Sequence, residues 1–255
     1  MSKSPRQERN GLNAEPEESS AYASPPCYQH ELDPHYRGAA DPEGTDPPDK
    51  ASVWATVRAW RHETRSRLIA LRDDLTDGER MRCAEAIVKH LADASVLSGH
   101  QRVGFYCPMA GEIDLRPMMT ELTNQGVQAA LPVITDKKQP LEFWAWHPGD
   151  KLDESGPWGI PVPSRRQLVD VNALLIPLVG FDDQGHRLGH GGGYFDRTLT
   201  SMDPRPMTVG IGFEACRLST IVPQAHDIPM DIIVTDAGVY RSEANSATPK
   251  PTTGK

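Results

Sequence analysis

Short apolar runs of strand type alternate with longer runs of helical periodicity along residues 51–241, and this alternation restricts the chain to a few architectures. The first run has apolar side chains at spacings of three and four over residues 52–75, which predicts a long helix. Thr76 and Glu79 then form the pattern of a capping box, which predicts a second helix over 77–94. The alternation predicts one α/β domain with a mainly parallel sheet flanked by helices. We expect strands at 102–107, 127–133, 141–146, 173–178, 207–213 and 232–235, and further helices at 115–125 and 193–201.

Residues 1–50 differ from this domain in composition. They hold eight prolines, ten Asp or Glu residues against five Lys or Arg residues, and only six large apolar residues. Such a segment cannot bury enough apolar surface to offset the entropy that ordering it would cost. We therefore expect an acidic, Pro-rich disordered tail over 1–50, a folded domain over 51–241 and a second disordered tail over 242–255.

The sequence disfavours several classes of protein. No stretch approaches the ~18 consecutive apolar residues of a membrane span, and the N-terminus lacks the apolar core of a secretory signal. The chain has a formal charge of −8, of which residues 1–50 carry −5, and the mild acidity of the remaining part disfavours general nucleic-acid binding but leaves a local basic patch open. The four cysteines, at positions 27, 83, 107 and 216, form no CxxC pair. We therefore expect a cytoplasmic protein with no membrane, no nucleic acid and no structural zinc as a partner.

Residues 174–197 have the pattern most typical of a ligand site, because an apolar strand and a polar turn lead through a glycine-rich loop into a helix. Glycines allow backbone N–H groups to approach phosphate oxygens, and a helix N-terminus favours anions. The loop lacks the Lys-Ser/Thr pair of a P-loop, so its glycines alone also fit a plain flexible turn. Arg187, His190, Tyr194 and Asp196 surround the glycines, and this set of side chains favours a phosphate site.

The sequence of that loop, RLGHGGGYFDR, closely resembles the signature R-L-G-x-G-x-G-[YF]-[YF]-D-R of 5-formyltetrahydrofolate cyclo-ligases, also called methenyltetrahydrofolate synthetases. Further segments match that family in its own order, from about residue 58 to residue 241. They are Arg61 to Arg65 with Arg72 to Thr76, Gly111 to Asp114, Trp158 to Pro163, Pro177 to Gly185, and His226 to Asp231. The resemblance implies a three-layer α/β fold of the cyclo-ligase or NagB-like kind.

The resemblance also implies a reaction. Members of the family convert 5-formyltetrahydrofolate and ATP to 5,10-methenyltetrahydrofolate, ADP and phosphate with Mg²⁺, by phosphorylation of the formyl oxygen and ring closure by N10. The implied partners are ATP and the folate, with or without an extended glutamate chain. The implied oligomeric state is a monomer or a weak homodimer. The reaction needs positioning and charge neutralisation rather than a nucleophilic side chain, which fits the lack of a Ser–His–Asp or Cys–His pattern here.

The family's functional positions carry over onto matching residues of this sequence. The implied catalytic residues are Arg187 and Tyr194. The implied ATP-binding residues belong to the first helix and the glycine-rich loop: Arg61, Arg65, Arg187, Leu188, Gly189, His190, Gly191, Gly192, Gly193, Tyr194 and Phe195. The implied folate-binding residues are Cys107, Glu112, Trp158, His190 and Tyr194. The implied Mg²⁺ ligands are Asp196 and Asp227, with Asp231 as an open alternative to Asp227.

One of these positions departs from the family pattern. Arg61 stands where the family has lysine, and a planar, bulkier guanidinium is not a neutral substitute at a phosphate site. On the resemblance alone, we expect Arg61→Lys to leave activity equal or higher. The departure keeps open a non-catalytic folate- or nucleotide-binding paralogue on the same scaffold. In a third hypothesis, an unrelated phosphotransferase with the same loop, Glu112 and the segment around Trp158 would have no role.

Overall fold

The computed structural model describes residues 48–109, 111–153 and 159–242. The two predicted tails lie outside these ranges, except at their inner ends. Helix α2 begins at Pro48 and so takes in the last three residues of the predicted N-terminal tail, and the described chain ends at Ser242. None of the described helices has the length and apolarity that crossing a membrane requires.

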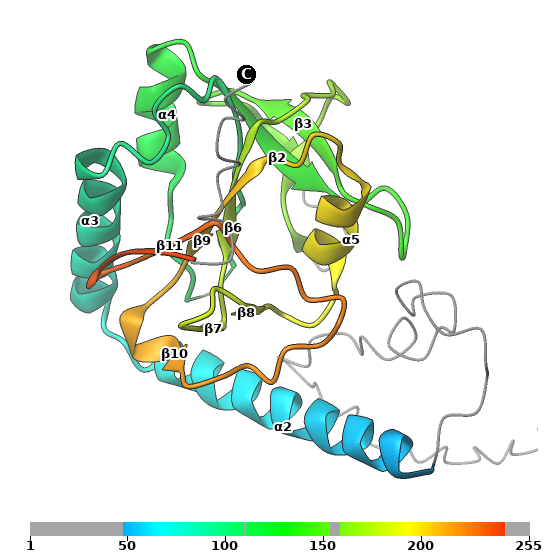
Figure 1. The fold of residues 1–255 in the computed structure, drawn as a ribbon. Helices are drawn as coiled ribbons and strands as arrows, with labels where there is room; N and C mark the ends of the chain where they lie inside the picture. The colour runs from blue at the N-terminus through cyan, green and yellow to red at the C-terminus, as the bar shows by residue number, and fades with distance from the viewer. Residues whose placement is uncertain (1–47, 110, 154–158, 243–255) are drawn as a thin grey trace, which may run out of the picture.

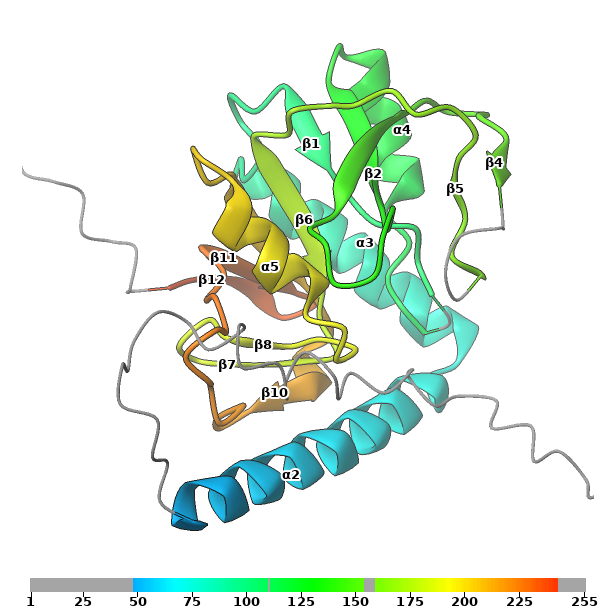
Figure 2. The same cartoon turned by 90° about the vertical axis from the view of Figure 1, so that its right-hand side faces the viewer.

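The helices form the outer layers of the fold. Helices α3 (Asp77–Asp93) and α4 (Arg116–Asn124) cover one face of a central sheet, and α5 (Tyr194–Ser201) covers the other face (Figure 1). The longest helix, α2 (Pro48–Asp73), runs across one end of the molecule (Figure 2). This arrangement confirms the predicted three-layer α/β fold.

The central sheet has seven strands in the order β12-β11-β9-β6-β1-β2-β3. Neighbouring strands from β11 to β2 are parallel, whereas β3 and β12 pair antiparallel at the two edges, so the sheet is mainly parallel as predicted. The strands span Arg102–Gly104 (β1), Gln128–Val133 (β2), Glu142–Trp146 (β3), Ala173–Pro177 (β6), Met207–Ile211 (β9), Ile232–Thr235 (β11) and Gly238–Arg241 (β12).

Two small sheets stand beside the central one, in segments for which the sequence predicted no strand. One contains β7 (Gly180–Asp182), β8 (Arg187–Leu188) and β10 (Arg217–Leu218), and the other pairs β4 (Leu152–Asp153) with β5 (Val162–Pro163). A 3-10 turn, η3 (Glu214–Cys216), precedes β10. Strands of two or three residues are too short to show a period of two, and that is why sequence patterns miss them.

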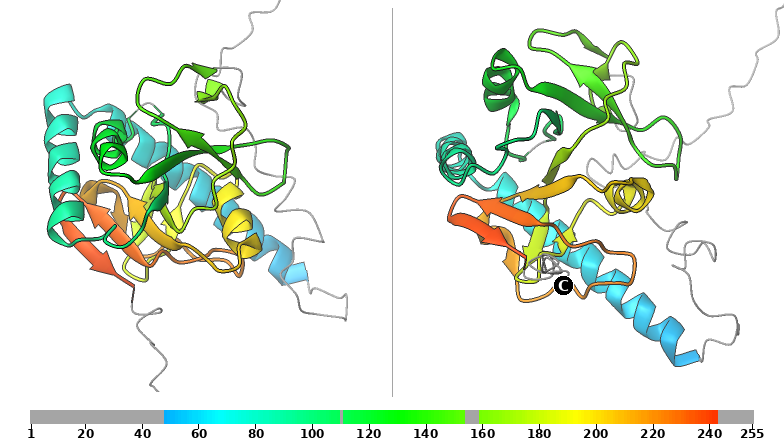
Figure 3. Two further views of the ribbon diagram at one scale, coloured as in Figure 1. Left: turned by 90° about the horizontal axis from the view of Figure 1, so that it is seen from above. Right: turned by 45° about the horizontal axis from the view of Figure 1, so that its top comes forward.

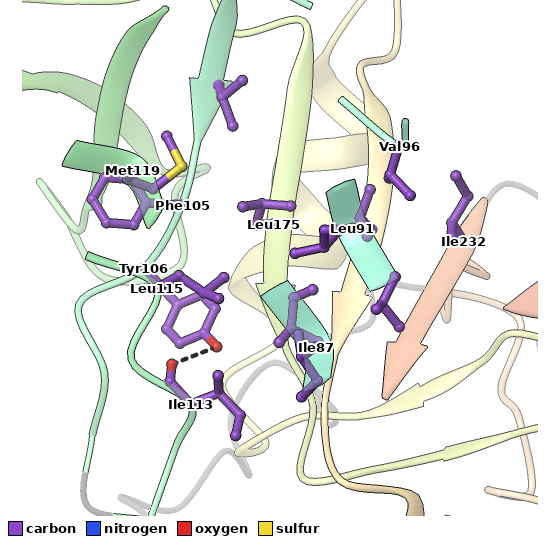
Figure 4. Packing of buried hydrophobic residues seen from close by; sticks show 14 of the residues in the cluster. Ile87, Leu91, Val96, Phe105, Tyr106, Ile113, Leu115, Met119, Leu175 and Ile232 are labelled. Atoms are coloured by element: carbon purple, nitrogen blue, oxygen red, sulfur yellow. Dashed lines mark hydrogen bonds between the residues drawn. The ribbon is translucent and has the colours of Figure 1, made fainter. Parts of the chain in front are cut away.

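The strand residues divide their side chains between two cores, one on each face of the sheet. Leu175 and Ile232 belong to the core beneath α3 and α4, while Leu174 and Ile233, one position away, belong to the core on the α5 side. Figure 4 shows the first core, in which the Tyr106 hydroxyl donates to the Ile113 carbonyl oxygen at 2.9 Å. This alternation follows from the two-residue period of a strand, and it explains why both faces are apolar in a mainly parallel sheet.

The strand order reverses between β1 and β6. From β1 the chain proceeds to β2 and β3 on one side, and it then returns to β6, β9 and β11 on the other side (Figure 3). In open α/β sheets, ligands bind outside the carboxyl ends of the strands at such a reversal. The loop after β1 and the segment after β6 are therefore the places where the fold predicts a site.

The capping box predicted at Thr76 is present, and its contribution to the stability of the protein can be measured with a variant. Thr76 Oγ1 accepts from the Glu79 amide at 3.3 Å, and the Glu79 carboxylate accepts from the Thr76 amide at 2.8 Å. We expect Thr76→Ala to lower the midpoint of thermal unfolding by roughly 2–4 °C, because the first turn of α3 loses its cap. Thr120→Ala is the control, since that hydroxyl bonds only the Arg116 carbonyl within its own helix. Equal midpoints for the two variants would contradict a stabilising cap.

Candidate active site

The glycine-rich loop connects β8 to α5 and depends on two glycine conformations. Gly191 has φ of 100° and Gly193, the residue before the first turn of α5, has φ of 58°. Other residues rarely adopt these backbone angles, so the sequence needs glycine at both positions to turn the chain into the helix. The turn places Tyr194 at the start of α5 and Asp196 within its first turn.

Arg187 and Asp196 flank this loop and form a buried ion pair. Arg187 Nη2 donates to Asp196 Oδ2 at 2.8 Å, and Arg187 Nη1 donates to the Ile228 carbonyl oxygen at 3.4 Å. The other Asp196 oxygen accepts from the Ile228 amide at 3.2 Å. The last strand before the loop, the helix after it and the chain near residue 228 therefore meet at one point.

A second buried ion pair joins α2 to the same part of the chain. Arg61 pairs with Asp227, and it also donates to the carbonyl oxygens of Ile221 at 3.2 Å and Val222 at 3.0 Å. Asp227 immediately precedes Ile228, whose amide bonds Asp196. The two carboxylates predicted as metal ligands thus belong to one connected group, and each of them accepts from an arginine.

The glycine-rich loop is bonded on two sides. On one side, Arg65 Nε of α2 donates to the Gly189 carbonyl oxygen at 2.8 Å. On the other side, His190 Nε2 lies 2.8 Å from Glu112 Oε1, in the loop that follows β1. The structure therefore brings together the helix, the glycine-rich loop and the Glu112 loop, which the sequence placed at one site although they are distant along the chain.

Both carboxylate oxygens of Glu112 are bonded, and its side chain is almost completely buried. Its side chain is 3% exposed, and Oε2 accepts from the Met109 amide at 2.9 Å. Cys107 precedes it and is also buried, and burial raises the pKa of that thiol above its ordinary value. A thiol kept neutral in this way suits packing beside a substrate rather than nucleophilic attack.

Two further arginines support the site and were given no role by the sequence patterns. Arg197 Nη2 donates to the Gly192 carbonyl oxygen at 2.9 Å, and its guanidinium lies 4.6 Å from the centre of the Tyr194 ring. Arg72 is 2% exposed, and its Nη1 donates to the Leu178 carbonyl oxygen at 3.3 Å, just after β6. The family motifs could have pointed to both arginines as site residues, since Arg197 ends the signature of the glycine-rich loop and Arg72 belongs to the motif that follows the first-helix pattern.

The remaining predicted residues take different positions. The Leu188 side chain is buried in the core, so only its backbone faces the loop. Phe195 packs against the core on the α5 side and lies 5.9 Å from the Arg187 guanidinium. Asp231 accepts from the amide and hydroxyl of Thr208 in strand β9, whereas Asp227 directly precedes Ile228, whose amide donates to Asp196. Trp158 lies outside the described residues.

The site offers carboxylate oxygens, which are the donors that a magnesium ion prefers. Within the described ranges, no group of three or more His, Cys, Asp or Glu side chains could hold a metal ion. Mg²⁺ at nucleotide sites needs fewer protein ligands, because one or two carboxylates share it with phosphate oxygens and water. Asp196 and Asp227 supply two carboxylates of that kind, each of which accepts from an arginine in this structure.

Comparisons with known proteins show which family this chain resembles. The sequence model of the 5-formyltetrahydrofolate cyclo-ligase family matches residues 57–236. A 5-formyltetrahydrofolate cyclo-ligase of Haemophilus influenzae is 26% identical over 181 residues, which cover 68% of this chain and 97% of the relative. The corresponding Escherichia coli K12 protein is 28% identical over 165 residues, which cover 61% of this chain and 88% of the relative.

A solved structure extends the likeness to the fold. The NMR structure of Aquifex aeolicus 5,10-methenyltetrahydrofolate synthetase superimposes with a TM-score of 0.65 and 28% sequence identity, and the match covers 76% of this chain and 99% of that one. The family match spans the glycine-rich loop, the Glu112 loop and both buried ion pairs. The chain therefore belongs to the 5-formyltetrahydrofolate cyclo-ligase family.

Proposed function

We propose that this protein converts 5-formyltetrahydrofolate and ATP to 5,10-methenyltetrahydrofolate, ADP and phosphate with the help of Mg²⁺. Membership of the family supports the reaction class, and the names of the relatives supply the substrate and product. The proposal includes a cytoplasmic location, which fits the three cysteines that are free thiols in the described chain.

One observation carries the proposal. The glycine-rich loop bonds Arg65 on one side and Glu112 on the other, so a phosphate-type loop stands between a cationic helix face and a buried carboxylate. This order of groups suits phosphoryl transfer to a folate, with phosphate between arginines and the N–H donors of the pterin at a carboxylate. A plain turn between a strand and a helix would need neither contact.

In this proposal Glu112 and Arg187 have separate tasks. Glu112 accepts hydrogen bonds from N–H donors of the folate ring and so fixes the formyl group near the loop. Arg187 balances charge on the γ-phosphoryl group as the formyl oxygen bonds phosphorus and the bond to ADP breaks. N10 then attacks the formyl carbon, loses its proton and expels phosphate. Tyr194, at the start of α5, packs against a ring beside the reacting groups, with Arg197 on its face.

Asp196 and Asp227 are the residues that would hold Mg²⁺, which supplies charge neutralisation at the phosphates when bound. Arg187 is bonded to Asp196 in the structure described here, and the same guanidinium fork suits phosphate oxygens.

The test is direct. Purified full-length protein is mixed with 5-formyltetrahydrofolate, ATP and Mg²⁺, and the absorbance of the methenyl product is followed. We expect product that depends on both ATP and Mg²⁺, with one ADP formed per methenyl group. Binding of ATP and folate without product would instead identify a non-catalytic paralogue.

A further inference from the structure

We propose that Arg61 is a positioning residue that fixes the chain over residues 221–227 to α2 and thereby fixes Asp227, which directly precedes the residue whose amide bonds Asp196. The structural part of this proposal stands on the contacts alone, whereas its consequence for turnover rests on the proposed function. It assigns a use to the arginine that replaces the family's lysine, and it revises the expectation that a lysine would serve equally well there.

The guanidinium of Arg61 is fully committed to this one segment. Nε donates to Ile221, Nη2 donates to Val222 and pairs with Asp227, and Nη1 lies 3.4 Å from the second Asp227 oxygen. Arg61 is 5% exposed, and the Asp227 side chain is 9% exposed. A buried guanidinium whose three nitrogens are all bonded to protein groups is typical of a structural contact, or tie, between two segments rather than of a side chain available to a ligand.

The electrostatics of Asp227 agree with this tie. Arg61 supplies a positive charge and hydrogen bonds to the buried Asp227 carboxylate. The amide of Gln224 also donates to the carboxylate, at 2.6 Å. Asp227 is thus held in one orientation by Arg61 and the Gln224 amide.

The segment that Arg61 holds contains a strained residue. Val222 has φ of 52°, a left-handed conformation that is unfavourable for a β-branched side chain. Its carbonyl oxygen accepts from Arg61 Nη2 and from Gln224 Nε2 at 2.7 Å. Strain of this kind persists only where surrounding contacts enforce it, and Arg61 supplies one of these contacts from another element.

The other anchors of the segment explain why its position matters for the site. The Ile221 amide donates to Asp182 Oδ2 at 3.1 Å, and the Ile228 amide donates to Asp196 Oδ1 at 3.2 Å. Between these two points, Arg61 is the side chain that ties the segment to α2. Loss of that tie would move Asp227 relative to Asp196, the residue with which it would share Mg²⁺.

A lysine cannot replace this arrangement. Its ammonium is a single point of charge with a flexible stem, so it can bond Asp227 or one carbonyl oxygen, but it cannot span all three in the plane of a guanidinium. Arg58 provides a matched control, because it lies one turn earlier on α2 and has no hydrogen bond or ion pair to the described residues.

The first experiment uses ligand-free protein. Thermal unfolding is measured for Arg61→Lys, Asp227→Asn, the double variant and Arg58→Lys. We expect Arg61→Lys to lower the midpoint by roughly 5 °C and Arg58→Lys by no more than about 1 °C. Asp227→Asn should lower the midpoint in the wild-type background and lower it less in the Arg61→Lys background, because a lysine that bonds a carbonyl oxygen no longer bonds Asp227, and one that bonds Asp227 makes fewer hydrogen bonds than the guanidinium. Additive shifts, or a wild-type midpoint for Arg61→Lys, would overturn the proposal.

The second experiment separates positioning from direct contact with the nucleotide. For Arg61→Lys, we expect kcat to fall about tenfold while the KM for ATP changes less than about threefold, because a displaced Asp227 impairs the reaction more than binding. A raised KM for ATP with unchanged kcat and midpoint would overturn the proposal in favour of direct nucleotide contact. If the wild-type protein forms no methenyl product but the unfolding shifts are coupled, the tie is supported and the proposed function fails separately.

Discussion

Arg187→Ala is expected to reduce the kcat for methenyltetrahydrofolate formation by about 10²–10³-fold, with the KM for 5-formyltetrahydrofolate within about threefold of the wild-type value. Arg187 is the buried cation between the glycine-rich loop and Asp196, so its loss removes a positive charge where phosphoryl charge develops. The folate would be bound mainly through Glu112, on the other side of the loop, and its affinity should change little.

The same substitution also breaks a buried ion pair, so stability has to be separated from chemistry. Loss of one partner of such a pair costs roughly 3–5 kcal/mol because the other charge stays buried. Arg187→Ala combined with Asp196→Asn should regain part of that stability without regaining turnover. Arg217→Ala is the matched control, since Arg217 also pairs with a carboxylate and lies 4.7 Å from an aromatic ring, that of Phe181, outside the site. Unimpaired turnover in Arg187→Ala would remove Arg187 from the phosphate site.

Glu112→Gln is expected to lower kcat/KM for 5-formyltetrahydrofolate by roughly 10–100-fold, mainly through a higher KM. The amide keeps the size of the side chain but loses the negative charge, and hydrogen bonds to a charged group contribute about 1.5–3 kcal/mol. The KM for ATP should change far less, because Glu112 contacts the glycine-rich loop only through His190.

Steady-state kinetics with each substrate varied in turn measures this difference. Glu142→Gln is the control, because the Glu142 carboxylate bonds Arg166 and Trp144 near the sheet edge instead of the loop. A folate KM that stays at the wild-type value in Glu112→Gln would assign the pterin to another part of the chain. Equal increases in the KM of folate and ATP would point to disruption of the His190 contact rather than loss of a folate ligand.

Sequence patterns predicted the layers of the fold because those depend on local periodicity. The expected helix over 77–94 corresponds to α3, and the strand expected over 173–178 corresponds to β6, which ends at Pro177. The strand expected over 102–107 is shorter in the structure, since β1 ends at Gly104. Phe105 still bonds the neighbouring strand through its amide, so the pairing ends gradually before Pro108.

The partners of the charged residues could not be predicted in this way. Arg61 and Asp227 are 166 positions apart, and Glu112 and His190 are 78 positions apart. No periodicity of one segment specifies contacts at such separations, because they depend on how the sheet order brings loops together. The motifs showed which residues belong to the site, but only the fold shows that Asp227 is bonded by Arg61 and Asp196 by Arg187.

Helix α2 has a consequence for how insertions in this chain would be tolerated. Arg61, Arg65, Leu68 and Arg72 succeed one another at steps of four, three and four, and they reach respectively the 221–227 segment, the glycine-rich loop, the core and the end of β6. One residue inserted between Arg61 and Arg72 would rotate the side chains that precede the insertion by about 100° relative to those that follow it, so the two groups could no longer reach their partners at the same time. The same insertion after Asp73, where the helix has ended, would leave this register intact. We therefore expect insertions to be tolerated in the turn between α2 and α3 and to disrupt the site between Arg61 and Arg72.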